Sequence, residues 1–227
     1  MPELPEVETI ARGLSRRLLG RVLEEIEPRR ADLRAPIPLD LKARLRGERI
    51  RHIGRRAKYL LIETENDQVL IAHLGMSGRM IFDDPAAPRP LQPHDHVIFT
   101  FDDGTRLRFN DARRFGRLDL TTAPELARHP LLAFLGPEPL GNEFNGESLA
   151  RVLAARSGPL KTVLLDQRVV AGLGNIYVCE SLYRAGLSPL RAASTVSGAG
   201  AERLARAIRA VLESAIAAGG SSLRDYV

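Results

Sequence analysis

The hydrophobic pattern of this chain changes its period near Thr121. Before this point, short segments rich in β-branched, aromatic and aliphatic residues follow one another closely, as antiparallel strands do. After it, apolar residues recur at helical spacing. The predicted strands are 21–27, 58–63, 68–74, 79–82, 96–101 and 105–110. The predicted helices of the second half are 147–156, 159–166, 175–185 and 201–218.

One further helix is predicted ahead of the strands. Its apolar face consists of Val7, Ile10, Ala11, Leu14 and Leu18. Pro5 suits the first turn of such a helix, and Gly20 can end it. Short strands after a single helix favour a β-sandwich against which that helix packs.

The fold class is therefore expected to be α+β, with two domains. Residues 1–134 are predicted to form the β-sandwich, and residues 135–227 an all-α domain. The stretch 135–141 holds two prolines and two glycines, and it is the predicted hinge.

Composition and charge limit which partners this chain can bind and in which cellular compartment it is expected. A hydrophobic content of 44% suits a globular protein, and no apolar run is long enough to span a bilayer. A net charge of +5 permits a polyanionic partner. One cysteine, Cys179, excludes internal disulfides and a thiolate metal site. Without a signal-peptide pattern, a cytoplasmic protein is expected.

The first residues offer an unusual nucleophile. Proline after the initiator methionine is a small penultimate residue, so aminopeptidases can remove Met1 and leave Pro2 as a secondary amine. The pKa of an α-amino group is about 7.7–8.0, so a useful fraction is uncharged at neutral pH. Glu3 is close enough in sequence to shuttle protons for it. The plainer interpretation is an amphipathic helix with ordinary capping.

Three loop or turn segments combine functional groups with tight geometry. Residues 55–60 place basic groups at a strand entrance, which suits phosphate binding or merely a solvated strand end. Residues 73–78, HLGMSG, form a loop with two glycines, in which Met76 alone would suggest core packing. Residues 110–116, NDARRFG, follow a predicted strand and contain two arginines and a phenylalanine.

A fourth segment lies in the helical half. Residues 172–177, GLGNIY, contain two glycines before a predicted helix that Asn175 is expected to cap. Free amides at a helix N-terminus form an anion site, although a structural turn is the simpler interpretation. His94-Asp95-His96 lacks further ligands at suitable spacing, so no metal site is predicted there.

Taken together and in order, these motifs resemble bacterial formamidopyrimidine-DNA glycosylase. The resemblance rests on PELPEVE at 2–8, HLGMSG, NDARRFG and the stretch from Gln167 to Tyr177. It implies an amino-terminal β-sandwich and a helix-two-turn-helix domain. It also implies a bifunctional enzyme that removes 8-oxoguanine and formamidopyrimidines from DNA. A Schiff base on Pro2 would then lead to β,δ-elimination at the abasic site.

The resemblance also implies roles for individual residues. Pro2 is the implied nucleophile, Glu3 shuttles protons, and Lys58 holds phosphate near the lesion as part of the catalytic set. Glu6 supports this site by position. Met76, Arg113 and Phe115 are expected to fill the gap left by the flipped nucleotide, with Arg113 facing the orphaned base. Further DNA contacts are assigned to His94, Lys161 and Asn175. Ala112 stands where the family has proline, which removes no functional group.

The implied partner is double-stranded DNA containing oxidised purines, bound by a monomer in the bacterial cytoplasm. No cofactor is expected within this chain. The family carries one structural zinc in a carboxy-terminal finger with four cysteines, after a lesion-contacting loop that follows residues 219–222. Residues 1–227 hold only Cys179. We therefore expect this form to lack the finger, to fold without metal and to bind lesion DNA weakly.

Two alternatives stay open. A sister branch of the family removes oxidised pyrimidines, although Met76, Arg113 and Phe115 favour the purine branch. A non-catalytic protein that binds damaged DNA is the second alternative. It applies if Met1 is retained or the finger is naturally absent, because a retained methionine turns the Pro2 nitrogen into an amide.

Overall fold

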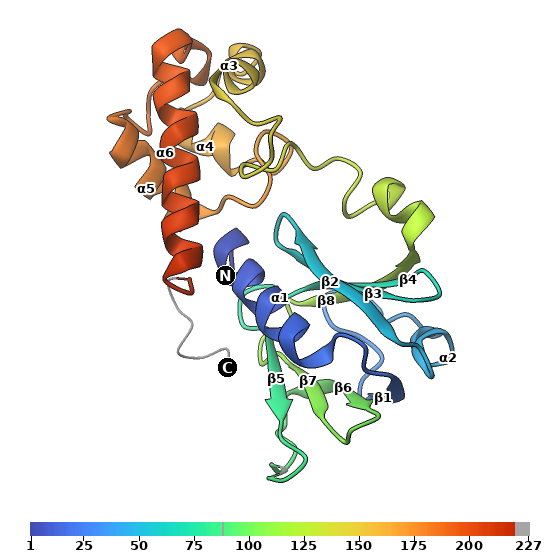
Figure 1. The fold of residues 1–227 in the computed structure, drawn as a ribbon. Helices are drawn as coiled ribbons and strands as arrows, with labels where there is room; N and C mark the ends of the chain where they lie inside the picture. The colour runs from blue at the N-terminus through green and yellow to red at the C-terminus, as the bar shows by residue number, and fades with distance from the viewer. Residues whose placement is uncertain (88, 221–227) are drawn as a thin grey trace. The chain divides into compact units, whose positions relative to one another are not determined.

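The computed structural model describes residues 1–87 and 89–220. These residues form two compact units. The first comprises residues 1–2 and 6–129, and the second comprises residues 3–5 and 130–220. The predicted α+β class is confirmed, because one unit is built on two sheets and the other on helices (Figure 1).

The first unit is a sandwich of two four-stranded sheets in which every neighbouring pair is antiparallel. One sheet has the order β1 (Leu23–Pro28), β6 (Asp95–Phe101), β7 (Arg106–Asn110) and β5 (Arg79–Asp83). The other has the order β2 (Ile50–Arg56), β3 (Tyr59–Thr64), β4 (Gln68–His73) and β8 (Arg117–Thr122).

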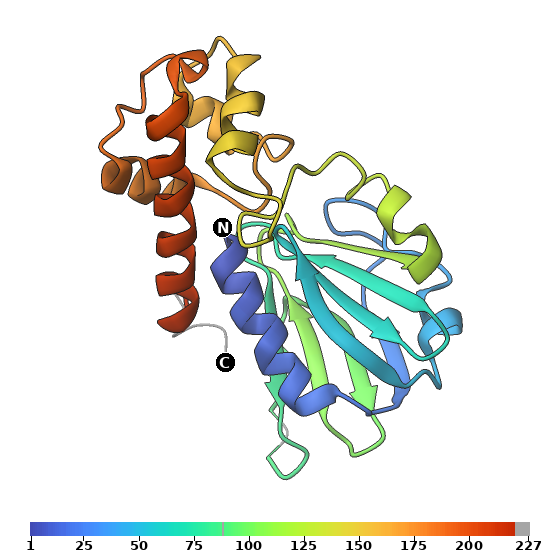
Figure 2. The same cartoon turned by 45° about the horizontal axis from the view of Figure 1, so that its top comes forward.

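Helix α1 (Leu4–Leu18) runs along one side of these sheets from Glu6 onward (Figure 2). All five residues of its predicted apolar face are buried, and they join inward-facing residues of both sheets in one core. Gly20, just past the helix, has a φ of +77°, a left-handed conformation in which glycine is favoured. The unit also contains the short helix α2 (Leu41–Leu45) and the 3-10 helix η1 (Ala123–Arg128).

Three charged side chains, Arg108, Asp83 and Asp95, are buried together in the first sheet. The guanidinium of Arg108 donates to Asp83 at 2.7 Å and to Asp95 at 2.8 Å. Burial raises the pKa of Asp95, but hydrogen bonds from the Gln92 amide, Asn110 and Arg108 outweigh it and lower the pKa below its ordinary value. Each charge is thus compensated by partners on neighbouring segments.

The six predicted strands are confirmed, with ends displaced by one or two residues. Strands β2 and β8 were not predicted. In β2 (IRHIGRR), a glycine and four basic or imidazole side chains interrupt the apolar alternation. In β8 (RLDLTT), the alternation is regular but falls at the point where the pattern turns helical. Pairing with β4, which is buried, determines the structure of β8.

The second unit contains the helices α3 (Gly146–Ala154), α4 (Leu160–Leu165), α5 (Asn175–Ala185) and α6 (Gly198–Ala217), together with the 3-10 turn η2 (Ala193–Thr195). Helices α3 and α5 contact α6, and their apolar faces form a separate core (Figure 1). Helix α3 begins with a capping box between Asn145 and Ser148. Gly186 ends α5 in a left-handed conformation.

Of two further predictions about this unit, one is corrected by the structure and the other falls on residues outside the described ranges. Helix α6 begins at Gly198 rather than at the predicted residue 201. The expected lesion-contacting loop follows residues 219–222, of which 221 and 222 lie outside the described residues.

Candidate functional site

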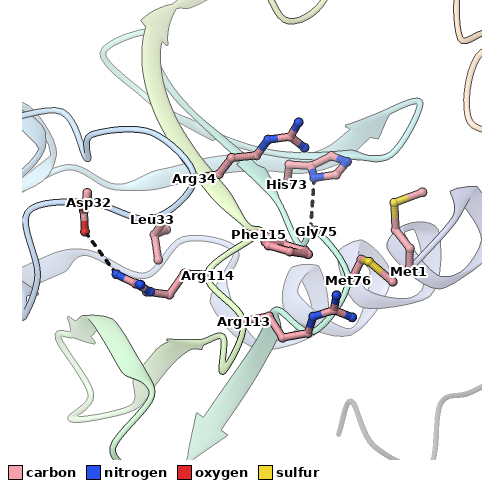
Figure 3. Close-up of a pocket in the computed structure, with 10 residues that line it drawn as sticks. All are labelled: Met1, Asp32, Leu33, Arg34, His73, Gly75, Met76, Arg113, Arg114 and Phe115. Carbon is pink, nitrogen blue, oxygen red and sulfur yellow. Dashed lines mark hydrogen bonds and ion pairs between the residues drawn. The ribbon is translucent and has the colours of Figure 1, made fainter.

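A cavity of about 690 Å³ opens on the first unit. Its lining includes Met76, Arg113 and Phe115, the residues expected to fill a gap in duplex DNA. Met76 is 47% exposed and Phe115 is 42% exposed, so both offer apolar surface to a partner. In Figure 3 the side chains of Met76 and Arg113 extend toward the same region as Met1.

The two loops that carry these residues approach each other closely. Residues 74–78 connect β4 to β5, and residues 111–116 connect β7 to β8. Gly75 has a φ of +61°, and a Cβ added there would overlap the Phe115 backbone carbonyl. Only glycine therefore combines this conformation with the close approach. The Arg113 guanidinium lies 4.6 Å from the centre of the Phe115 ring, a cation–π contact.

His73 also lines this cavity and was not assigned a role from the sequence. Its Nδ1 accepts a hydrogen bond from the Gly75 amide at 3.0 Å, so the ring proton of the neutral form lies on Nε2. Burial, followed by the charges of Lys58 and Arg34, lowers the pKa of His73 to about 4. His73 is thus a neutral donor at neutral pH. Its place in the HLGMSG motif was the available signal.

Lys58 is buried, with 6% of its surface exposed, so the interpretation of a solvated strand end is wrong for this residue. It follows Ala57, whose φ of +53° closes the tight turn between β2 and β3. The preceding Arg55 donates to the Glu8 carboxylate of α1 at 2.9 Å. This ion pair ties the first helix to the hairpin that holds Lys58.

The segment around His94 is held by its neighbours. The Asp111 amide donates to the His94 carbonyl at 3.0 Å, and the imidazole of His94 is exposed. His96 is buried, and its Nε2 lies 2.7 Å from the Asp111 carbonyl oxygen. Within residues 1–87 and 89–220, no group of three or more His, Cys, Asp or Glu side chains is placed to hold a metal ion.

At the amino terminus, Met1 is 52% exposed and lines the same cavity of the first unit. Pro2 is buried, and its nitrogen is an amide while Met1 is attached. Glu6 is buried in the first turn of α1, with 3% of its surface exposed.

The second unit contains the carboxylate of Glu3, bound at the N-terminus of α5. One oxygen accepts from the amides of Gly174 at 2.7 Å and Tyr177 at 3.4 Å, and the other accepts from Ile176 at 3.0 Å. Glu3 is only 3% exposed. The positive end of the helix dipole and these amides attract the negative charge.

This arrangement corrects two expectations about the GLGNIY segment. Gly174 is the N-cap, Asn175 is the first residue of α5, and the cap is supplied by Glu3 rather than by Asn175. The predicted anion site exists, but a carboxylate of the same chain binds there. A Cβ on Gly174 would overlap the Glu3 carboxyl group, and the Gln167 side chain braces the turn through Gly172 and Leu173.

The remaining predicted DNA contacts also lie on helices of this unit. Lys161 is half-buried in the first turn of α4, and Asn175 is exposed at the start of α5. The Lys161 amide donates to the Pro189 carbonyl at 3.1 Å, which fixes the start of α4 against the 188–191 turn. No helix among the described residues is long and apolar enough to cross a membrane.

The sequence matches two family models. Residues 1–118 match the N-terminal domain of formamidopyrimidine-DNA glycosylase, and residues 135–227 match its H2TH domain. The formamidopyrimidine-DNA glycosylase of Beijerinckia indica is 54% identical over 237 residues, covering all of this chain and 82% of the relative. The protein of the same name from Paracoccus denitrificans is 55% identical over 232 residues, with the same coverage.

Solved structures give the same result. The inhibited Lactococcus lactis enzyme bound to DNA containing N7-benzyl-Fapy-dG has a TM-score of 0.90 and 35% identity, over 98% of this chain and 82% of that one. The L. lactis enzyme bound to DNA with an abasic site has a TM-score of 0.89 and 36% identity, over 99% and 82%. The Thermus thermophilus protein has a TM-score of 0.84 and 40% identity, over 98% and 79%.

Proposed function

Because this chain belongs to the formamidopyrimidine-DNA glycosylase family, we infer that it excises oxidised purines from duplex DNA and then cleaves the abasic strand. Structural relatives are bound to DNA with a Fapy-dG derivative and to DNA with an abasic site, which resemble the first and the second substrate of such a reaction. The chain is accordingly a base-excision repair enzyme with glycosylase and lyase activities.

The observation that carries this proposal is the group of void-filling residues. Excision requires the damaged nucleotide to leave the stack, which costs a few kcal/mol. An exposed thioether, a guanidinium and an exposed phenyl ring beside one cavity can offset this cost by filling the gap. We assign Met76 and Phe115 to the apolar filling and Arg113 to the edge of the orphaned base.

For the chemistry, we assign the nucleophile to Pro2 once Met1 has been removed. The lone pair of its secondary amine attacks C1′ of the flipped nucleoside. The glycosidic bond from C1′ to the base nitrogen breaks, and the base leaves with the electron pair of that bond and takes up a proton. The amine nitrogen loses its proton, the bond from C1′ to the ring oxygen breaks, and the ring oxygen takes up a proton. The product is an iminium ion between C1′ and the Pro2 nitrogen. The iminium makes the C2′ proton acidic, and removal of that proton expels the 3′-phosphate. Removal of a second proton, from C4′, then expels the 5′-phosphate.

Glu3 is assigned to move protons during ring opening. Amide contacts that α5 makes with both of its oxygens hold the carboxylate in place within the second unit. Pre-organisation of a proton-transfer group in this way reduces the reorganisation required during the reaction. Glu6, buried one turn further along α1, supports the position of the amino terminus.

Phosphate contacts are assigned to two groups of residues. Lys58 in the first unit is assigned to the phosphate near the lesion, and His94 to an adjacent one. Lys161 and Asn175 in the second unit are assigned to phosphates through an ammonium and an amide at the starts of two helices. No residue of this chain is assigned to the structural zinc that the resemblance implies for the family.

Excision from matched duplexes tests this proposal. Three substrates would carry 8-oxoguanine, thymine glycol or an undamaged base at one position, and release of the free base would be followed over time. We expect release from the 8-oxoguanine duplex to be fastest. Faster release of thymine glycol would support the oxidised-pyrimidine branch instead. Tight binding of the lesion without release, together with an intact mass that includes Met1, would support a non-catalytic damage-binding protein.

A further inference from the structure

The two loops that carry the void-filling residues are joined by a polar clasp, which we define as the half-buried Ser77 and the buried Asp111. The Ser77 hydroxyl donates to Asp111 Oδ1 at 2.5 Å. The same hydroxyl oxygen accepts from the Arg113 amide at 3.2 Å. Asp111 Oδ2 accepts from the Gly116 amide at 2.7 Å. One serine and one carboxylate thus connect the 74–78 loop to both ends of the segment that holds Arg113 and Phe115.

The clasp itself does not face the cavity. Asp111 has no exposed surface, and neither Ser77 nor Asp111 is among the residues that line the cavity. Its hydrogen bonds are all directed into the two loops and to the adjoining His94 and His96 segment. A group so placed acts through the residues that it holds.

The backbone around the clasp leaves little freedom for either loop. Gly75 lies against the Phe115 backbone, and the Gly78 amide donates to the Leu74 carbonyl at 2.7 Å. The Arg114 amide closes a turn onto the Asp111 carbonyl at 3.3 Å, and Arg114 itself has a φ of +56°. A non-glycine residue in this region is strained, so neighbouring contacts must hold it there.

We propose that the clasp couples Met76 to Arg113 and Phe115, so that the three side chains enter a duplex as one unit. Ser77 and Asp111 are then positioning residues for damage recognition. This inference rests on the proposed function, because it assumes that these side chains fill a gap in DNA. Its structural part, the coupling of the two loops, concerns the free protein and can be tested without DNA.

Binding to DNA provides the first test. The probe is a duplex with a tetrahydrofuran abasic analogue, compared with the single strand of the same sequence. Ser77→Ala should weaken duplex binding about tenfold, the loss expected for a hydrogen bond to a charged group, and should change single-strand binding little. Ser77→Thr should restore binding because it keeps the hydroxyl. Ser214→Ala, at an exposed position of α6, is the matched control.

A double-mutant cycle then tests coupling directly. In the unmodified chain, Met76→Ala and Phe115→Ala each lower the affinity for the duplex by some factor. The double variant should lose less affinity than the product of these two factors, by at least about threefold. In the Ser77→Ala background, the loss of affinity in the double variant should equal the product of the two single losses. Independent effects in both backgrounds would overturn the proposal.

Amide hydrogen exchange of the free protein separates this inference from the proposed function. In Ser77→Ala, exchange at both Arg113 and Gly116 should accelerate, while exchange at Gly78 should stay unchanged. Acceleration at Arg113 alone would show a lost hydrogen bond without coupling and would overturn the proposal. If the unmodified chain shows no preference for the damaged duplex, the proposed function fails, and the exchange result still decides whether the loops are coupled.

Discussion

At the scale of single residues, Glu3 has two tasks that depend on one another. It is assigned to proton transfer, and it is also the cap of α5. The residue that makes room for it is Gly174, because any side chain there would overlap the carboxyl group. The sequence showed a glycine-rich turn and an acidic residue near the amino terminus, but it could not show that one binds the other across 171 positions.

We predict that Gly174→Ala displaces the Glu3 carboxylate from the α5 amides. Base excision should fall by at least about tenfold, since a misplaced catalytic group can cost 100-fold. Stability should fall by about 1–2 kcal/mol, the cost of a lost cap. Gly200→Ala is the matched control, because nothing lies within 4 Å of an added Cβ there. Equal activity of the two variants would refute the role given to Gly174.

His73 gives a prediction about pH. Its pKa in the folded state is about 4, against an ordinary 6.5, so the unfolded chain binds a proton that the folded chain does not. The contribution of His73 to the free energy of unfolding should therefore be complete above pH 6.5. It should be lost as the pH falls toward 4, by on the order of 1–3 kcal/mol.

Urea unfolding at several pH values measures this effect. His73→Asn keeps an acceptor for the Gly75 amide but does not titrate, so its loss of stability at low pH should be smaller. His52→Asn changes an exposed histidine and should keep the original pH profile. If His73→Asn and the unmodified chain lose stability equally, His73 is not the group responsible.

At the scale of elements, the alternating strands and the helix ends were predictable, whereas β2 and β8 were not. Pro5 and Gly20 mark the two ends of α1 by their own conformational preferences, so these ends could be predicted from the sequence. Strand β2 owes its structure to pairing with β3, a long-range property that its own arginines and glycine conceal. The void-filling loops were located by motif, but the polar clasp behind them was not.

The loop 111–116 carries a prediction about rigidity. Ala112 is the second residue of the turn closed between Arg114 and Asp111, a position where proline is favoured. Its amide donates no hydrogen bond within the part of the chain described. Ala112→Pro should therefore raise the free energy of unfolding by about 0.4–1 kcal/mol and preserve binding to the abasic duplex. Thermal unfolding checks this, and a destabilised variant would show that the turn cannot accept a proline φ.

At the scale of the whole molecule, the functional assignments divide between the two units. The first unit contains the cavity, the void-filling loops and Lys58, and the second contains the amides that bind Glu3. The chain crosses between them within its first residues, since Leu4 belongs to the core of the second unit and Val7 to that of the first. The motif PELPEVE therefore contains the proposed nucleophile and the proposed proton shuttle, and it also contributes residues to the cores of both units.

The central claim is that the amine of Pro2 attacks the damaged nucleoside, and borohydride trapping tests it most directly. Loss of Met1 is first established from the intact mass of the protein. The protein is then incubated in excess over an 8-oxoguanine duplex while borohydride reduces any iminium ion to a stable amine. Digestion and mass spectrometry then locate the cross-link, with the undamaged duplex as the control. The account predicts a covalent adduct on the amino-terminal peptide at Pro2. An adduct on Lys58 or Lys161, with Pro2→Gly fully active, would contradict it.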